Sequence, residues 1–453
     1  MTTKLEAAPA PARGGAWLKD WRPEDEHFWQ SEGKALAWRT LAITTANLIM
    51  AFIVWFVVSA LVVRLPNIGF KLTTTELFWL AAMPGLAGGS LRIIHTFLVP
   101  LYGTRKVIVF STLSLIVPAV GWFFAVQDPT TPYWVLMVLA LLAGLGGGNF
   151  SSFMPSTSLF FPKRLQGTAL GIQAGVGNFG VSVVQFLTPW IVSFALFGTL
   201  FGSPQTLTRG TASSSIWLQN ATLIYIPFIL IFCAMAWVML RSVPVRANVR
   251  EQMDIFSDKH TWFMTSLYIM TFGSFSGFSA TFPLLIRQVY GGLPGAPDPL
   301  TYAFLGPLVG SIVRIMAGPI SDRFGGAIVT HISGIGLLAC AIGVTFFTAP
   351  TSMASFDYFL WLMLGLFFFA GVGNASTFKQ MPMIFPPRQA GGVIGWTGAM
   401  AAYGPFLWGV LFGWSFAATK SPNAFFYALA VFYALNIALN WWFYARKGAP
   451  KPC

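Results

Sequence analysis

Three basic side chains lie inside stretches of sequence that are otherwise apolar: Arg92, Arg314 and Lys379. A charged side chain at the centre of a bilayer costs about 2.5–3.5 kcal/mol on insertion scales, so it needs a partner there. All 14 acidic residues fall outside these stretches, which leaves no carboxylate to pair with them. The simplest counter-ion is therefore a bound anion. A pair of guanidinium groups suits a small planar oxyanion, because each donates paired N–H bonds to two coplanar oxygens.

Each of these side chains also has a less specific interpretation. For Arg92 and Arg314 it is extension of the charge to the membrane interface or pairing with backbone carbonyl oxygens. Arg314 precedes Asp322 by about two helical turns, and Lys379 lies shortly before Phe385, so both could extend their charge to the membrane interface. His95 follows Arg92 by one turn and would share its helix face, where an imidazole titrates near neutral pH. We therefore consider His95 and Lys379 as coupling or gating residues, with a hydrogen-bonded packing histidine as the alternative for His95.

The elements that must position these charges are membrane-spanning helices. Of the 453 residues, 55% are hydrophobic and only 9% are charged, against roughly a quarter charged in soluble domains. Apolar stretches of about twenty residues recur along the chain, and an open chain satisfies its backbone in lipid only as helix. The sequence predicts an all-α membrane protein. We expect twelve spans, near residues 41–63, 77–101, 107–126, 132–160, 166–199, 218–240, 262–286, 300–318, 326–348, 358–385, 391–417 and 423–445.

The distribution of positive charge predicts the topology. Most of the 27 Lys and Arg residues fall in the tails and in alternate loops, which the positive-inside rule places in the cytoplasm together with both termini. The net charge of +13 is therefore a topology signal, and we expect no nucleic-acid partner. Residues 1–38 have no apolar core typical of a signal peptide, and we expect a short amphipathic helix or disorder there.

The chain contains an internal repeat. Gly167, Gly171 and Gly180 match Gly391, Gly395 and Gly404 in one register, and Ala143-Gly-Leu-Gly146 is echoed by Ala370-Gly-Val-Gly373. Two parallel halves of six helices are typical of the major facilitator fold. Arg92 and Arg314 are separated by nearly the same interval, so we expect them to face each other from matching helices. The expected divisions are a cytoplasmic segment 1–38, bundles 39–240 and 261–446, a linker 241–260 and a tail 447–453.

Small residues concentrate in two of the spans. Gly171, Gly175 and Gly177 lie in the fifth span, and Gly395 and Gly398 lie in the eleventh. Such spacing lets helices approach closely and slide, although each glycine alone is equally consistent with ordinary tight packing. Taken together they indicate helices that move past each other.

The glycine-rich spans and the arginines resemble the nitrate/nitrite porter family of the major facilitator superfamily, over nearly the whole chain. The first signature of that family is similar to Gly171-Ile-Gln-Ala-Gly-Val-Gly-Asn-Phe-Gly180, and the second to residues 391–406. A superfamily loop motif is similar to residues 318–325, which include Asp322. By this resemblance, the anion would be held by Arg92, Arg314, Asn178, Phe150, Tyr268 and Phe272.

The resemblance implies import of nitrate in exchange for nitrite by alternating access. The family also contains proton-coupled nitrate symporters, and symport usually needs an ionisable residue in the pathway. The spans contain no carboxylate, which favours exchange, with His95 as the titrating group of the alternative. His95 and Lys379 both depart from the family pattern, so the coupling mode is left open.

Other classes of function fit the sequence less well. An enzyme would need carboxylates, histidine clusters or an activated nucleophile among the spans, and a channel would not need glycine-lined moving helices. An anion sensor would need an output domain, for which the short tails leave no room. We expect no cofactor or metal, because Cys233, Cys340 and Cys453 are scattered. The expected protein is a monomer in a bacterial inner membrane.

Overall fold

A computed structural model describes residues 16–196, 198, 200–209, 212–243 and 253–453. The described chain is almost entirely helical, with short 3₁₀ or π turns labelled η. The first part of the chain forms α1 (Glu26–Phe28), η1 (Trp29–Gly33), α2 (Lys34–Leu61), η2 (Leu65–Ile68), α3 (Thr74–Tyr102), α4 (Thr104–Leu113), α5 (Ile116–Ala125), α6 (Tyr133–Ala143), α7 (Leu145–Ser158), α8 (Lys163–Ile191), β1 (Gln205–Arg209), β2 (Ala212–Ile216), α9 (Asn220–Leu223) and α10 (Tyr225–Met239).

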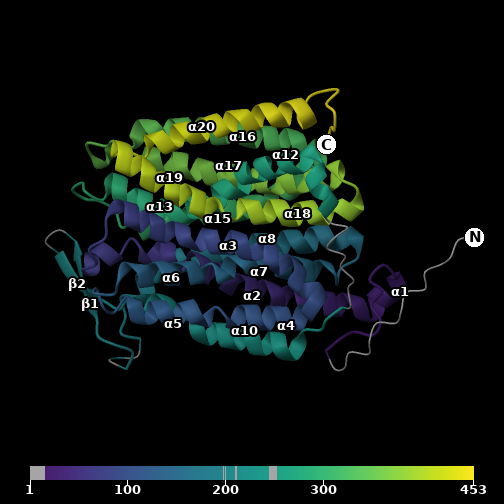
Figure 1. The fold of residues 1–453 in the computed structure, drawn as a ribbon, viewed down its shortest axis with the longest axis horizontal. Helices are drawn as coiled ribbons and strands as arrows, with labels where there is room; N and C mark the ends of the chain where they lie inside the picture. Colours follow the sequence, from purple (N-terminus) through teal and green to yellow (C-terminus); the bar gives the residue numbers. More distant parts are fainter. Residues whose placement is uncertain (1–15, 197, 199, 210–211, 244–252) are drawn as a thin grey trace, which may run out of the picture.

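The second part follows the same plan. It forms η3 (Met253–Ser257), α12 (Lys259–Tyr268), η4 (Ile269–Gly273), α13 (Ser274–Tyr290), α14 (Pro299–Ala303), α15 (Leu305–Phe324), α16 (Gly326–Val344), η5 (Thr345–Phe347), η6 (Met353–Ser355), α17 (Phe356–Ile384), α18 (Pro387–Ala401), α19 (Gly404–Thr419), α20 (Asn423–Asn440) and η7 (Trp441–Ala445). In Figure 1 the helices of the first part lie together below those of the second, all roughly parallel to one axis.

Eleven helices of the described chain are long and apolar enough to cross a membrane. They coincide with eleven of the twelve expected spans, allowing for differences at the ends. The expected span 391–417 is instead formed by α18 and α19, which are separated by a turn at Ala402 and Tyr403. Each piece is therefore shorter than the bilayer requires, and hydropathy alone does not reveal the break.

The two parts of the chain meet along small residues. α3 packs against α18 and α19, and α8 packs against α15. A side chain added at Gly89 would overlap the ring of Tyr403, and one added at Gly409 would meet Ala82 at 2.6 Å. These helices therefore approach at backbone distance, as the density of small residues predicts.

The segment expected as cytoplasmic, 1–38, is ordered where the structure describes it. Residues 1–15 lie outside the described part, but Glu26 begins a continuous helix that runs into α2. Trp21 Nε1 donates to the carbonyl oxygen of Leu159 at 2.9 Å, and Arg164 pairs with Glu26 at 2.5 Å. Because these partners lie around the start of α8, the segment packs against the helix ends. In the expected linker 241–260, residues 244–252 lie outside the described chain.

A β-hairpin that the sequence analysis did not predict follows α8. Hydropathy extended the fifth span to residue 199, whereas α8 ends at Ile191. The strands β1 and β2 pair antiparallel, with Gln205 opposite Ile216. In Figure 1 the hairpin lies at one end of the bundle, and α1 and the C-terminus lie at the other. We call these the hairpin end and the terminal end.

Candidate functional site

Arg92 lies in the middle of α3 and is fully buried. The helix begins with a capping box formed by Thr73 and Glu76, which fixes its register. Arg92 Nε donates to the carbonyl oxygen of Gly147 on α7 at 2.9 Å, and Nη1 donates to that of Gly398 on α18 at 2.7 Å. The guanidinium thus bridges the two parts of the chain, and its Nη2 has no hydrogen-bond partner.

Aromatic rings surround this guanidinium. Its central carbon lies 4.6 Å from the ring centre of Phe150, 5.2 Å from that of Phe272 and 5.3 Å from that of Trp55. Ring faces attract a cation and exclude water, which lowers the cost of burying the charge. Phe150 and Phe272 were expected here from the resemblance, whereas Trp55 was not.

Arg314 lies on α15 and is 7% exposed, so it does not extend to the membrane interface. Its central carbon lies 5.3 Å from the ring centre of Phe378 and 5.9 Å from that of Phe272. Phe272 therefore contacts both guanidinium groups. The expectation that the two arginines share one site agrees with this geometry, and Nη1 of Arg314 has no hydrogen-bond partner.

Tyr268 completes the aromatic part of the site. Its ring stacks on Phe272 at a centroid distance of 5.5 Å and contacts Phe378 at 5.0 Å. The hydroxyl is close enough to Arg92 and Arg314 to interact electrostatically with both, but it makes no hydrogen bond of ordinary geometry.

Several buried polar atoms have no hydrogen-bond partner in the described chain. They include three donors of the arginine site, Arg92 Nη2, Arg314 Nη1 and the hydroxyl of Tyr268, and also both amide atoms of Asn178 on α8 and of Asn374 on α17. An unsatisfied buried polar group costs about 1–3 kcal/mol, and more if it is charged. Within the described residues, neither arginine forms an ion pair with a carboxylate. Arg92 Nη2, Arg314 Nη1 and the Tyr268 hydroxyl are donors, and one small anion would accept from all three.

The glycines expected to be functional divide into two groups. A side chain at Gly175 would meet Ile315 at 2.5 Å, and one at Gly177 would meet Leu48 at 2.7 Å, so α8 packs closely there. Gly395 and Gly398 have looser neighbours, Thr96 at 3.8 Å and Arg92 Nη1 at 3.9 Å. Four glycines toward the terminal end have nothing within 4 Å of an added side chain: Gly167, Gly171, Gly318 and Gly391. At these positions α8, α15 and α18 leave space.

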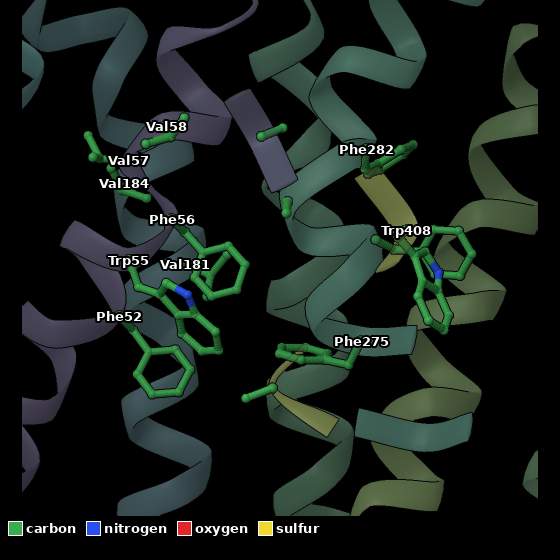
Figure 2. Close-up of a cluster of buried hydrophobic side chains, with 14 of the residues drawn as sticks. Phe52, Trp55, Phe56, Val57, Val58, Val181, Val184, Phe275, Phe282 and Trp408 are labelled. Carbon is green, nitrogen blue, oxygen red and sulfur yellow. The ribbon is translucent and has the colours of Figure 1, made fainter. Parts of the chain in front are cut away.

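The hairpin end is closed. Arg64 pairs with Asp298 at 2.5 Å, with the two side chains 5% and 19% exposed, and Arg287 donates to the carbonyl oxygen of Val63 at 2.6 Å. Both contacts join the two parts of the chain. Beneath them lies an apolar layer that Figure 2 shows, with α2 and α8 on one side and α13 and α19 on the other: Phe52, Trp55, Phe56, Val57, Val58, Val181, Val184, Phe275, Phe282 and Trp408.

His95 is buried beside the arginine site. Its Nδ1 lies 2.9 Å from the hydroxyl oxygen of Ser152, and its ring packs against Gly148. This is the environment of a hydrogen-bonded packing histidine.

Lys379 does not join the arginine pair. Its ammonium forms an ion pair with Asp322 at 2.5 Å, and the two side chains are 40% and 63% exposed. The acid was assigned to the cytoplasmic loop, but it lies in the last turns of α15. Lys379 thus reaches the terminal end, as expected for a lysine near the end of a span.

Sequence reasoning missed Trp55, Phe378 and Asn374. Aromatic residues are too frequent in this chain, at 16%, for Trp55 or Phe378 to stand out. Asn374 directly follows the repeated motif at Gly373, and the repeat was the signal that could have revealed it.

The chain is similar to known membrane transporters in both sequence and fold. Residues 43–382 match the model of the Major Facilitator Superfamily. The chain is 68% identical to a probable nitrate/nitrite antiporter NarK2 of Thermus thermophilus, covering 97% of this chain and 99% of that one. It is 38% identical to the nitrate/nitrite transporter NarU of Escherichia coli (strain K12), covering 95% and 96%. A bacterial homologue of the human lysosomal transporter Spinster, solved in an inward-facing, occupied conformation, shares the fold with a TM-score of 0.61 at 14% identity, covering 88% and 95%.

Proposed function

The chain belongs to the nitrate/nitrite porters of the Major Facilitator Superfamily, and we propose that it imports nitrate in exchange for nitrite. The names of its relatives support nitrate and nitrite as the transported ions. One observation carries the proposal for the site: Arg92 and Arg314 are buried around the ring of Phe272, each with an unpaired N–H group. The anion binds between these two side chains.

The chemistry of the site favours a small planar anion. Each guanidinium is a planar fork that donates to two coplanar oxygens. The aromatic rings beside the guanidinium groups present flat, largely apolar faces to the anion. Asn178 and Tyr268 add neutral donors from two further helices. A bulky or hydrated anion would lose more solvation than these groups return.

Transport proceeds by alternating access, as a rocking of one helix bundle against the other. The closed hairpin end and the space beside Gly171 and Gly391 support a state that opens toward the terminal end. Without an anion the two arginines repel each other and resist the closure needed to switch sides. Exchange follows, because the returning carrier needs nitrite to neutralise the same charges.

The proposed placement is a bacterial inner membrane with the terminal end in the cytoplasm. Figure 1 shows α1 and the C-terminus at the same end of the bundle, as an even number of spans requires. The excess of positive charge in the tails and loops at that end supports its cytoplasmic location. The two bundles correspond to residues 39–240 and 261–446.

A proton-coupled nitrate symporter is the second candidate. The observation that favours it is the position of His95, one turn from Arg92 and buried beside the site. The hydrogen bond to Ser152 favours a packing role instead.

Nitrate uptake into proteoliposomes, with and without internal nitrite and under an imposed pH gradient, tests the proposal. We expect uptake to require internal nitrite and to be insensitive to the gradient. The variant His95→Gln, which keeps a hydrogen-bonding group toward Ser152 but cannot titrate, should exchange at the wild-type rate. Uptake driven by the gradient alone and lost in His95→Gln would overturn exchange in favour of symport.

A further inference from the structure

Asn374 on α17 is fully buried, and neither its Nδ2 nor its Oδ1 has a hydrogen-bond partner. Other buried asparagines in the described chain donate their Nδ2 to a carbonyl oxygen: Asn47, Asn149, Asn220, Asn436 and Asn440. Within the described residues, only Asn178 and Asn374 leave both amide atoms unbonded. Burying an amide without partners is costly, so a ligand for Asn374 is to be expected.

The packing of α15 on α17 directs this amide toward Arg314. The helices touch where a side chain on Gly371 would meet the carbonyl oxygen of Gly310 at 2.5 Å. About two turns further along α17, Phe378 contacts Arg314, which lies about one turn beyond Gly310 on α15. Asn374 lies between Gly371 and Phe378 at three- and four-residue spacings, which share one helix face. Its side chain is therefore at the level of Arg314.

The next helix limits the direction further. Thr377 Oγ1 lies 3.4 Å from Thr271 Oγ1 in η4, and Phe378 packs on Tyr268. Asn374 consequently points into the seam between α15 and η4. Phe272, which contacts both guanidinium groups, belongs to the same η4 segment.

The internal repeat gives independent support. The motifs Ala143-Gly-Leu-Gly146 and Ala370-Gly-Val-Gly373 place Gly147 and Asn374 at equivalent positions of the two halves. The carbonyl oxygen of Gly147 accepts a hydrogen bond from Arg92. The second half therefore has a side-chain amide where the first half presents a backbone carbonyl to its arginine.

We infer that Asn374 donates a hydrogen bond to the bound anion beside Arg314 and favours nitrate over nitrite. The inference rests on the proposed function and adds a recognition element to the same site. Nitrate has three oxygens and nitrite two, so nitrate has more acceptor capacity left for a further donor once both arginine forks are engaged. An amide donor there stabilises bound nitrate and gains little with nitrite.

Calorimetric titration of the purified protein with sodium nitrate and with sodium nitrite tests the inference. A hydrogen bond to a charged group contributes about 1.5–3 kcal/mol, so Asn374→Leu should raise the Kd for nitrate roughly tenfold or more, and that for nitrite less than about threefold. Asn374→Asp has the same size but places a carboxylate beside Arg314. It should abolish binding of both anions.

The matched control is Asn436→Leu, a buried asparagine on α20 that donates to the carbonyl oxygen of Phe432. Both Kd values should be unchanged in this variant. Asn374→Ser retains a donor and should recover part of the nitrate preference, which separates loss of the donor from misfolding. Unchanged nitrate affinity in Asn374→Leu, or an equal loss for both anions, would overturn the role of Asn374 while leaving nitrate transport intact. Failure of the wild-type protein to bind nitrate would instead overturn the proposed function itself.

Discussion

Arg92 and Arg314 are buried by different means, although they belong to matching helices. Arg92 satisfies two of its donors with the carbonyl oxygens of Gly147 and Gly398, so part of its charge is neutralised by backbone dipoles. Arg314 is held by the faces of Phe272 and Phe378. Both keep an N–H group without a hydrogen-bond partner, which is the group that would donate to a bound anion.

Replacing either arginine by lysine should strongly reduce the rate of nitrate exchange. Lysine keeps the charge but offers a point donor in place of a planar fork, so two charged hydrogen bonds to the anion are lost or distorted. We expect nitrate exchange to fall about 100-fold or more in Arg92→Lys and in Arg314→Lys, equivalent to about 3 kcal/mol. Radiolabelled nitrate counterflow measures this.

Arg22→Lys serves as the control, because Arg22 is 60% exposed and pairs with the nearby surface acids Asp20 and Asp25. Its exchange rate should match that of the wild type. Near-normal exchange in both Arg92→Lys and Arg314→Lys would contradict the forked binding mode.

Two irregular helices lie side by side next to the site. The π turn η4 interrupts the helix that carries Tyr268 and Phe272, and the break between α18 and α19 ends at Gly404. A side chain on Gly404 would overlap the carbonyl oxygen of Gly273, so the two irregular points are in direct contact. π turns occur often at functional sites, where they redirect side chains.

The open glycines predict a variant that binds but does not exchange. Gly171 on α8 has free space beside it, so Gly171→Leu should fold and bind nitrate with wild-type affinity. The added side chain would occupy the space into which α8 and its neighbours close when the protein switches sides. Exchange should therefore fall at least about tenfold, which is about 1.4 kcal/mol in the barrier.

Gly292→Leu is the matched control, because Gly292 also has nothing within 4 Å but lies between α13 and α14. Binding by titration and exchange by counterflow separate the two effects. Wild-type exchange in Gly171→Leu would show that this space does not close during transport.

At the scale of the whole molecule, the two parts of the chain are held together at the hairpin end. Arg64, Asp298 and Arg287 provide the polar contacts across the hairpin end, above the apolar layer of Figure 2. In the proposed rocking of the two bundles, these contacts would break when the hairpin end opens, so their strength would set the equilibrium between the open and closed states.

Weakening the Arg64–Asp298 ion pair should shift the conformational equilibrium. In Asp298→Asn the side chain still caps α14, since asparagine is a good N-cap residue, but the charge opposite Arg64 is lost. Breaking a buried pair costs about 3–5 kcal/mol, so the state open at the hairpin end should gain at least tenfold in population.

Spin labels at Gly167→Cys and Gly318→Cys, with the native cysteines replaced, report the width of the terminal end. We expect shorter distances to gain population in Asp298→Asn, whereas the exposed pair removed by Asp20→Asn should leave the distribution unchanged. If Asp298→Asn has the same distribution of spin-label distances as the wild type, the Arg64–Asp298 pair does not hold the hairpin end closed.

The sequence alone determined the class of protein and most of its spans. Bilayer thickness and the cost of unpaired backbone in lipid leave twenty-residue apolar helices as the available solution, so composition and hydropathy predict them. The internal repeat predicted the major facilitator fold. Arg92 and Arg314 were recognisable because an unpaired intramembrane charge is rare and costly.

Only the tertiary structure decided which side chains surround these charges. Trp55 comes from α2, and Phe378 and Asn374 come from α17. All three are ordinary residues for a membrane span, so their role depends on rotation and depth within the bundle. Lys379 was a candidate from the sequence that the structure places away from the arginines. Its ion pair with Asp322 follows from where α15 and α17 end. The break between α18 and α19 also depends on packing between segments distant in sequence, because Gly404 lies against Gly273. Hydropathy measures each segment's preference for lipid, and it does not predict which other segments that segment packs against.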